Sequence, residues 1–362
     1  MGVPLFDTDS PLAGLREQII ERVGQVIRDG RFILGPEVSA FEQQLAGYVG
    51  VRHAIGVGNG TDALTLAARA VGVGPGDEVV VPAFTFYATA EAIASMGATP
   101  VFCDVDFDTR NVTVETVAAA ITPRTKAIVA VDLFGLPAPI SAIKQAHGLP
   151  VIEDAAQALG ATLDGRRAGA LGDIATFSFY PSKNLGAFGD AGAVVTDDPK
   201  LADTVRALRF HGSRDKQSFE MVGYNSRLDE VQAAVLRILL PELDGWCEGR
   251  RAAARAYADS RLSEYVTLPG EQAGADPAWH LYVVTHPEPA ELLRALNGAD
   301  VQARAYYRVP LHRQPAMLPF LNGGAVQLPV TDELARTNIA LPISPVLTAG
   351  QVGEVVAALA GE

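Results

Sequence analysis

The most informative run of the sequence is Phe177-Ser178-Phe179-Tyr180-Pro181-Ser182-Lys183-Asn184-Leu185-Gly186. Its first residues alternate as in a β-strand, and they lead into a loop that carries one lysine and continues into a glycine-rich run. A lysine in such a loop lies over a site instead of on a solvated helix face. Because burial or nearby cationic character lowers the pKa of a lysine and makes it nucleophilic, Lys183 is a candidate catalytic residue.

A second candidate follows the apolar run Val151-Ile152, which ends in Glu153-Asp154. Ligands of open α/β sheets bind at the carboxyl ends of the strands, so an acid at this point can face a site. A carboxylate there can keep a pyridine nitrogen protonated, as enzymes that use pyridoxal phosphate require. The alternative is an acid that caps the next helix.

Two further signals precede these residues in the chain. The glycine-rich turn Gly58-Asn59-Gly60-Thr61-Asp62 enters a helical stretch and would expose free amides to a phosphate, although a plain helix cap explains it equally well. The run Pro82–Thr89 places Phe86 at the end of a strand, where an aromatic ring can stack on a flat ligand or pack in the core. The order of phosphate turn, aromatic, acid and lysine is more specific than any one of them.

The chain between residues 54 and 198 alternates short apolar runs with Ala- and Leu-rich helical stretches. Such runs, apolar on both faces, predict parallel strands with crossover helices in a three-layer α/β domain. The predicted strands are Glu78–Pro82, Pro100–Asp104, Ala127–Val131, Pro150–Asp154, Ala175–Phe179 and Ala193–Thr196. We expect this large domain over residues 1–245 and a smaller α+β domain over residues 246–362.

Composition excludes several classes of protein. The net charge is −13 and the basic residues are scattered, which argues against a nucleic-acid-binding protein. No signal peptide or membrane-length apolar run is visible, so we expect a cytoplasmic protein. The two cysteines, Cys103 and Cys247, predict neither a disulfide framework nor a metal site.

Taken together, these blocks make the sequence resemble the DegT/StrS-type sugar aminotransferases, a branch of the type I (aspartate-aminotransferase) fold of enzymes that use pyridoxal phosphate. The likeness covers almost the whole chain. The blocks that carry it are NGTDAL, PAFTFYAT, EDAAQALGA, FSFYPSKNLGAFGDAGAV and GYNSRLDEVQAA.

The resemblance implies a role for each matched residue. Lys183 resembles the Schiff-base lysine and proton shuttle, and Asp154 the partner of the pyridine nitrogen. Phe86 resembles the ring stacked on the cofactor, and Gln157 the group near its 3′-oxygen. The expected phosphate cradle consists of Gly60, Thr61 and Ser178, with Asn225 reaching the phosphate of the neighbouring subunit in a homodimer with shared sites.

The implied reaction is a transamination in which L-glutamate leaves its amine as pyridoxamine phosphate and a nucleotide-linked keto-sugar takes it up. The run Lys183–Ala187 followed by Gly189-Asp190 is similar to members that act on 3-keto sugars, which favours a dTDP-linked 3-keto-6-deoxyhexose. A UDP-linked 3-keto sugar or a 4-keto sugar is the alternative. Tyr307, Arg308 and His312 are candidate substrate residues in a block that departs from the family's usual His-Tyr-Pro.

Two rival functions stay open at this stage. An ordinary amino-acid aminotransferase or lyase would need an arginine clamp for a carboxylate, for which Arg227 and Arg304 are candidates. A regulatory or binding protein on the same scaffold would lack turnover. Retention of Lys183, Asp154, Gln157 and Ser178 argues against the second rival.

Overall fold

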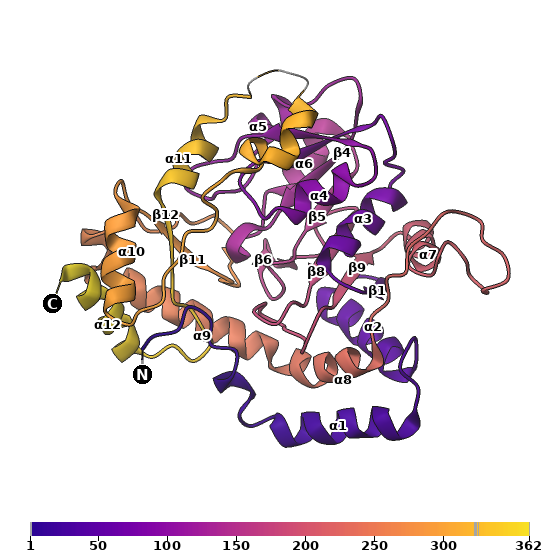
Figure 1. The fold of residues 1–362 in the computed structure, drawn as a ribbon, viewed down its shortest axis with the longest axis horizontal. Coiled ribbons are helices and arrows are strands. Elements are labelled where there is room, and N and C mark those ends of the chain that lie inside the picture. Colours follow the sequence, from indigo (N-terminus) through magenta and orange to yellow (C-terminus); the bar gives the residue numbers. More distant parts are fainter. Residues whose placement is uncertain (1, 322–323, 325, 362) are drawn as a thin grey trace.

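The computed structural model describes residues 2–321, 324 and 326–361, and its centre is a sheet of seven strands in the order β1-β9-β8-β5-β4-β2-β3 (Figure 1). The strands are β1 (His53–Val57), β2 (Glu78–Pro82), β3 (Thr99–Cys103), β4 (Thr125–Val131), β5 (Val151–Asp154), β8 (Ile174–Ser178) and β9 (Gly192–Thr196). A second small sheet contains β6 (Thr162–Leu163), β7 (Arg166–Arg167) and β10 (Ala275–Asp276).

Strand β9 runs against both of its neighbours, whereas the pairs among β8, β5, β4, β2 and β3 are parallel. The prediction of a mostly parallel sheet is confirmed, but the run Ala193–Thr196 is antiparallel. The physical reason is the connection from Phe179 to Ala191, which contains no helix. A parallel pair needs a crossover, usually helical, so this segment can only return the chain in the opposite direction.

Residues on each strand alternate between two cores, as the period of two requires. On β8, Ala175 and Phe177 pack in the core with α2 and α8, whereas Ile174 faces the core with α3 and α4. Both cores consist of buried apolar side chains. A ligand can therefore reach the sheet only at the polar ends of its strands. The helices of the large unit are α1 (Arg16–Asp29), α2 (Pro36–Val49), α3 (Gly60–Ala70), α4 (Ala88–Ala94), α5 (Val114–Ala118), α6 (Ile140–His147), α7 (Pro199–Leu208) and α8 (Glu230–Leu239).

The smaller unit is built on a third core around the antiparallel pair β11 (Tyr282–Thr285) and β12 (Asn338–Leu341). Its helices are α9 (Leu243–Ala258), α10 (Pro289–Gly298) and α12 (Ala349–Ala360). The segment that contains Leu311, Met317 and α11 (Pro329–Thr337) packs on the large unit's core instead. We propose a domain boundary near residue 245, after which only the segment with Leu311, Met317 and α11 packs against the large unit.

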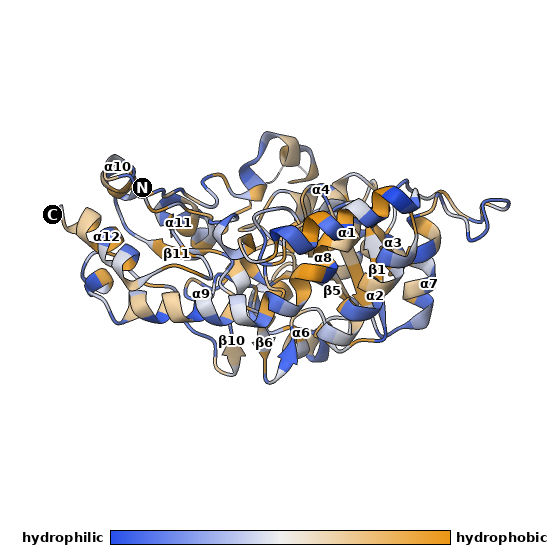
Figure 2. Ribbon diagram, turned by 90° about the horizontal axis from the view of Figure 1, so that it is seen from below, coloured by the Kyte–Doolittle hydropathy of each residue, from blue (hydrophilic) through white to orange (hydrophobic). Residues whose placement is uncertain are grey.

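Helix α1 carries exposed apolar side chains. Figure 2 shows hydrophobic residues among hydrophilic ones along this helix. Ile20 and Ile27 are 65% and 61% exposed, and the following Phe32 is 48% exposed. Such a group of exposed apolar side chains marks an interaction surface. Within the described residues, none of the helices has the length and apolar character that crossing a membrane would require.

Candidate active site

A cavity of about 770 Å³ opens at the carboxyl ends of the central strands. The residues around it come from regions far apart in sequence, including the turn before α3, the end of β5 and the loop after β8. Seven of the residues expected to hold the cofactor or act in the reaction line this one cavity: Gly60, Thr61, Phe86, Asp154, Gln157, Ser178 and Lys183.

Lys183 and Asp154 both line this cavity, and their opposite charges interact. Burial lowers the pKa of the Lys183 ammonium to about 8, while the nearby Asp154 carboxylate opposes this shift. Burial raises the pKa of Asp154. Two hydrogen bonds oppose this shift: the Thr89 hydroxyl donates to Oδ2 at 3.0 Å, and the amide of Ala156 donates to Oδ1. A lysine with this pKa is partly neutral near pH 7 to 8 and can act as a nucleophile and a base.

The amides at the start of α3 are available to an anion. Asn59 caps the helix by accepting the amide of Asp62 at 2.8 Å, whereas the amides of Gly60 and Thr61 have no acceptor among the described residues. Gly60 must be a glycine, because a Cβ there would lie 2.7 Å from the Cβ of Ser178. The helix start and the Ser178 hydroxyl therefore form a cradle of the right chemistry for a phosphate.

Gln157 is held in one orientation by its neighbours. Its Oε1 accepts the amide of Phe134 at 2.9 Å, and a backbone amide can only donate, so Nε2 must point the other way. That nitrogen donates to the hydroxyl of Tyr307 at 3.2 Å, which leaves its second hydrogen free. Gln157 thus offers a donor to an oxygen of a ligand in the cavity.

Three of the residues singled out in the sequence lie outside this cavity. Asn225 is exposed and accepts from Arg227, and Arg308 is exposed as well. His312 is buried, with its Nε2 3.4 Å from Asp332 Oδ1. Of the expected substrate residues only Tyr307 is a wall residue, and neither Arg227 nor Arg304 lines the cavity. Roles for Asn225, Arg308 and His312 stay predictions.

The structure adds wall residues that the sequence did not reveal. Phe6 stacks on His280 with ring centroids 5.9 Å apart, and Tyr306 lines the same cavity. Burial, followed by the charges of Lys183 and Arg250, holds the pKa of His280 well below its usual range. No local motif marks these residues, because the chain brings them together over more than a hundred positions.

A pair of buried acids lies behind Asp154. Asp132 follows β4, and its Oδ1 accepts the amide of Ala138 at 2.8 Å. Among the described residues, no group forms a hydrogen bond with its buried Oδ2. Glu153 accepts three amides, from Gly169, Leu171 and Gly172. Burial, and then the charge of Glu153, raises the pKa of Asp132 well above its usual range. Burial raises the pKa of Glu153 as well, but its three amide donors oppose that shift, so Asp132 holds a proton more readily than Glu153 does.

We expect Asp132→Asn to become more stable relative to the parent as the pH rises from 5 to 8. A raised folded-state pKa of an acid gives stability that is complete below its unfolded pKa and is lost as the pH rises towards the folded value. Asparagine does not titrate, so the difference should grow by up to about 1.4 kcal/mol per pH unit. Thermal and urea unfolding at several pH values measures this difference. Parallel curves for the two proteins would show that Asp132 is ionised when folded.

Residues 14–360 match the model of the DegT/DnrJ/EryC1/StrS aminotransferase family. The chain belongs to this family. A relative from Acidithiobacillus ferrooxidans, named UDP-N-acetyl-3-dehydro-alpha-D-glucosamine 3-aminotransferase, is 44% identical over 98% of this chain and 96% of its own. A Streptomyces venezuelae relative, named dTDP-3-amino-3,4,6-trideoxy-alpha-D-glucose transaminase, is 44% identical over 99% of this chain and 95% of its own. A Geobacillus stearothermophilus relative with the same identity over 99% of this chain and 98% of its own is named a pleiotropic regulatory protein.

Solved structures agree with the family assignment. S. venezuelae DesV, in complex with a ketimine intermediate, superposes with a TM-score of 0.94 at 44% identity, covering 99% of this chain and 97% of that one. NtdA from Bacillus subtilis, with the bound cofactor PMP, gives a TM-score of 0.91 at 31% identity, covering 99% and 85%. The predictions of an aminotransferase, of the type I fold and of pyridoxal phosphate as the cofactor are confirmed.

The cavity of this aminotransferase fits such a cofactor. The phosphate cradle around Gly60 is closed by Ser178, and a side chain at position 60 would clash there. Asp154 is 5% exposed and forms no ion pair within 4 Å among the described residues, so a protonated ring nitrogen would satisfy it. Phe86 is 55% exposed in the single chain and lines the same space, which leaves its ring free to stack.

Proposed function

We propose that this aminotransferase transfers the amino group of L-glutamate to carbon 3 of a nucleotide-linked 3-keto sugar, with a dTDP-linked 3-keto-6-deoxyhexose as the first choice and a UDP-linked 3-keto sugar as the second. The observation that carries the proposal is the joint placement of Lys183 and Asp154 in one cavity of about 770 Å³. The names of the A. ferrooxidans and S. venezuelae relatives both place the amine at position 3, which supports this regiochemistry.

Pyridoxal phosphate, when bound, supplies an electron sink for the negative charge that develops at the carbon bearing the nitrogen. Lys183 would take a proton from that carbon and deliver it to the carbon on the other side of the nitrogen, because a pKa of about 8 lets Nζ exchange protons near neutral pH. Asp154 keeps the ring nitrogen protonated, and the Thr89 hydroxyl orients its Oδ2. Gln157 presents an N–H group to the ring oxygen, held there by Phe134 and Tyr307.

The amides of Gly60 and Thr61 and the Ser178 hydroxyl would hold the phosphate, at the positive end of the α3 dipole. This arrangement needs no arginine of the same chain. The charged side chains around the cavity are acidic apart from Lys183, and they comprise Asp62, Glu91, Asp154 and Asp190. Cationic groups for a diphosphate must therefore come from outside this wall.

We propose a homodimer whose sites are completed by the partner. Asn225 lies outside its own cavity and is exposed, as a residue that serves a neighbouring site would be. Exposed apolar side chains are available for such an interface: besides Ile20 and Ile27 on α1, Tyr180 and Phe188 are 56% and 52% exposed. Burial of these surfaces between two copies is worth roughly 25 cal/mol per Å² of apolar area. We also propose that Arg308 and His312 contact the nucleotide sugar.

The proposal predicts which sugar restores the aldehyde form of the cofactor. Protein loaded with pyridoxamine phosphate is mixed with dTDP- and UDP-linked 3-keto and 4-keto sugars, and the return of the visible absorption is followed. We expect a 3-keto sugar to restore it and a 4-keto sugar to leave it unchanged. A response to 4-keto sugars alone would contradict the regiochemistry. A protein that stays colourless with added pyridoxal phosphate would favour a regulatory function instead.

A further inference from the structure

His280 offers one ring nitrogen to the cavity of the candidate active site. The residue precedes β11, is 4% exposed, and lines the same space as Lys183 and Asp154. Among the described residues, no group forms a hydrogen bond with either ring nitrogen. Nδ1 is fully buried, whereas Nε2 is not among the fully buried atoms that lack a partner. Nε2 is therefore the nitrogen that a ligand in the cavity can reach.

The imidazole of His280 is neutral. Burial, followed by the positive charges of Lys183 and Arg250, holds its pKa well below the usual range. A neutral imidazole carries one hydrogen, and buried N–H groups without an acceptor are rarer than buried acceptors without a donor. We therefore place the hydrogen on Nε2 and leave Nδ1 bare. His280 then presents an uncharged N–H group to the cavity.

The backbone and the ring of His280 are both fixed by their neighbours. The amide of Ala278 donates to the carbonyl of Gly135 at 2.9 Å. Gly135 has a φ of 101°, and a Cβ there would lie 2.6 Å from the amide nitrogen of Trp279 and 2.8 Å from that of His280. Only glycine permits this close approach. On the ring itself, Phe6 stacks with the centroids 5.9 Å apart.

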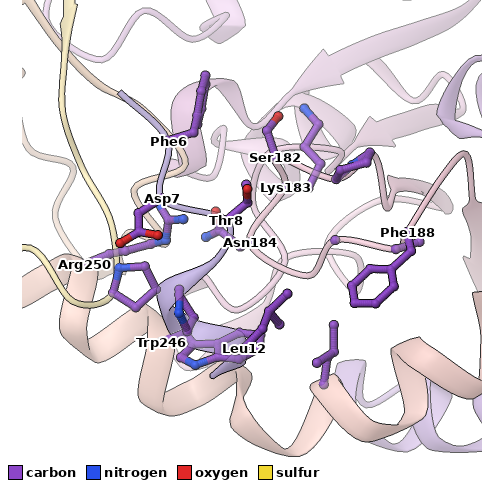
Figure 3. Close-up of a pocket in the computed structure, with 16 residues that line it drawn as sticks. Phe6, Asp7, Thr8, Leu12, Ser182, Lys183, Asn184, Phe188, Trp246 and Arg250 are labelled. Atoms are coloured by element: carbon purple, nitrogen blue, oxygen red, sulfur yellow. The ribbon is translucent and has the colours of Figure 1, made fainter. Parts of the chain in front are cut away.

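Two buried side chains hold the same segment. Asn184, which directly follows Lys183, donates from Nδ2 to the carbonyl of Ala278 at 2.7 Å. Arg250 donates from Nη1 to the carbonyl of Trp279 at 3.1 Å. Figure 3 shows these two side chains, one on the loop after β8 and the other on α9, at a smaller cavity of about 230 Å³. The loop that carries the reactive lysine therefore also fixes the segment that carries the imidazole.

An uncharged donor suits a cavity that receives two different substrates in turn. The amino acid brings a carboxylate to the reacting carbon, whereas the keto-sugar brings hydroxyl groups to the same place. An arginine fork would pair with the carboxylate, but it would remain a buried charge without a partner when the sugar is bound. Among the wall residues that the structure describes, Lys183 is the only cation. A neutral N–H group can donate to either kind of oxygen without leaving a charge behind.

We propose that the Nε2–H group of His280 donates a hydrogen bond to the α-carboxylate of the amino-acid donor, and in the second half-reaction to a hydroxyl of the sugar beside the keto carbon. The inference rests on the proposed function, which supplies both substrates. It makes His280 a substrate-binding residue of both half-reactions. The contacts from Asn184, Arg250 and Gly135 then serve to hold this donor beside Lys183.

The first test measures binding to the protein loaded with pyridoxal phosphate. The probe is L-α-methylglutamate, which keeps the α-carboxylate but has no α-hydrogen to lose. His280→Phe keeps a ring against Phe6 and removes the donor, so we expect the affinity to fall by about 10- to 100-fold, with a matching rise in KM for L-glutamate. His280→Gln restores an N–H group and should regain most of this loss. Affinity for dTDP and UDP should be the same in all of these proteins.

The second half-reaction is tested with the pyridoxamine-phosphate form. Because a hydroxyl acceptor carries no charge, its hydrogen bond is weaker than that of a carboxylate. We expect KM for the 3-keto sugar to rise by about 3- to 10-fold in His280→Phe and to recover in His280→Gln. A rise for L-glutamate without any change for the sugar would overturn the shared role.

A further measurement needs no turnover. In ¹⁵N spectra of protein labelled at histidine, the signal that disappears in His280→Phe identifies this residue among the six histidines. We expect a bare Nδ1 and a protonated Nε2, with the Nε2 signal shifting when L-α-methylglutamate is added. A hydrogen on Nδ1, or a signal that the ligand does not move, would overturn the inference.

His147→Gln serves as the matched control, because His147 lies on α6 and does not line the cavity. Should His280→Phe fold poorly, the spectra of the parent and the affinity of His280→Gln still test the site. Unchanged affinity for L-α-methylglutamate in His280→Phe, or an equal loss of affinity for dTDP, would overturn this inference alone. A parent protein that takes an amine from no amino acid would overturn the proposed function instead.

Discussion

Lys183→Ala should lose amine transfer by about 10⁴-fold or more, because the variant lacks both the nucleophile and the group that moves the proton. Lys183 lines the cavity beside Asp154, and burial brings its pKa to about 8, so no solvent-exposed lysine can replace it. Single-turnover transfer measures the rate. Borohydride reduction followed by mass determination should detect a covalent adduct with pyridoxal phosphate in the parent only.

Two further proteins sharpen this experiment. Lys183→Arg keeps a positive charge near Asp154 but cannot bond to the aldehyde, so it should be as inactive as the alanine variant. Lys200→Ala, on the exposed start of α7, should behave as the parent. Capture of pyridoxal phosphate by the parent should also speed up with pH and level off above about 8, where the amine is neutral. Turnover near the parental rate in Lys183→Ala would refute the assignment.

Asp154→Asn should lower kcat by about 10³-fold, since loss of the charged partner of the ring nitrogen removes roughly 4 kcal/mol of barrier lowering. The variant keeps the shape of the side chain and the contact with the Thr89 hydroxyl, so the fold should survive. Affinity for pyridoxal phosphate should fall much less than kcat, because the phosphate cradle at α3 is untouched.

A cofactor analogue separates charge from shape at this position. In Asp154→Ala, pyridoxal phosphate methylated at the ring nitrogen carries a permanent positive charge and should recover part of the lost rate. The parent should gain nothing from the same analogue. A rate for Asp154→Asn within tenfold of the parent would show that this carboxylate is structural.

The sequence predicted the central strands closely, because a run that is apolar on both faces and bounded by Gly or Pro leaves few alternatives. The predicted strand Glu78–Pro82 coincides with β2, and Ala127–Val131 lies within β4. The same pattern placed Asp154 at the end of β5 and Lys183 in the loop that follows β8. Both residues are local features of the chain, and local features are what a single sequence displays.

The features that the sequence did not reveal depend on long-range contacts. His280 meets Phe6, and Tyr307 meets Gln157, across gaps that no periodicity spans. The reversed direction of β9 depends on how the chain returns from the Lys183 loop. Arg250 looks like one more arginine of an amphipathic helix, and only the structure shows that its guanidinium edge is unpaired.

Residues 3–5 are held against residues 301–302. Val3 pairs with Val301, and the amide of Leu5 donates to Gln302 at 3.2 Å, which carries Phe6 to its place against His280. The ribosome synthesises Leu5 long before Gln302, which lies 297 positions further along, so this pairing can form only after residue 302 has emerged. The wall that Phe6 contributes is therefore completed late, and the substrate pocket stays unfinished until its last wall residue, Tyr307, has been synthesised.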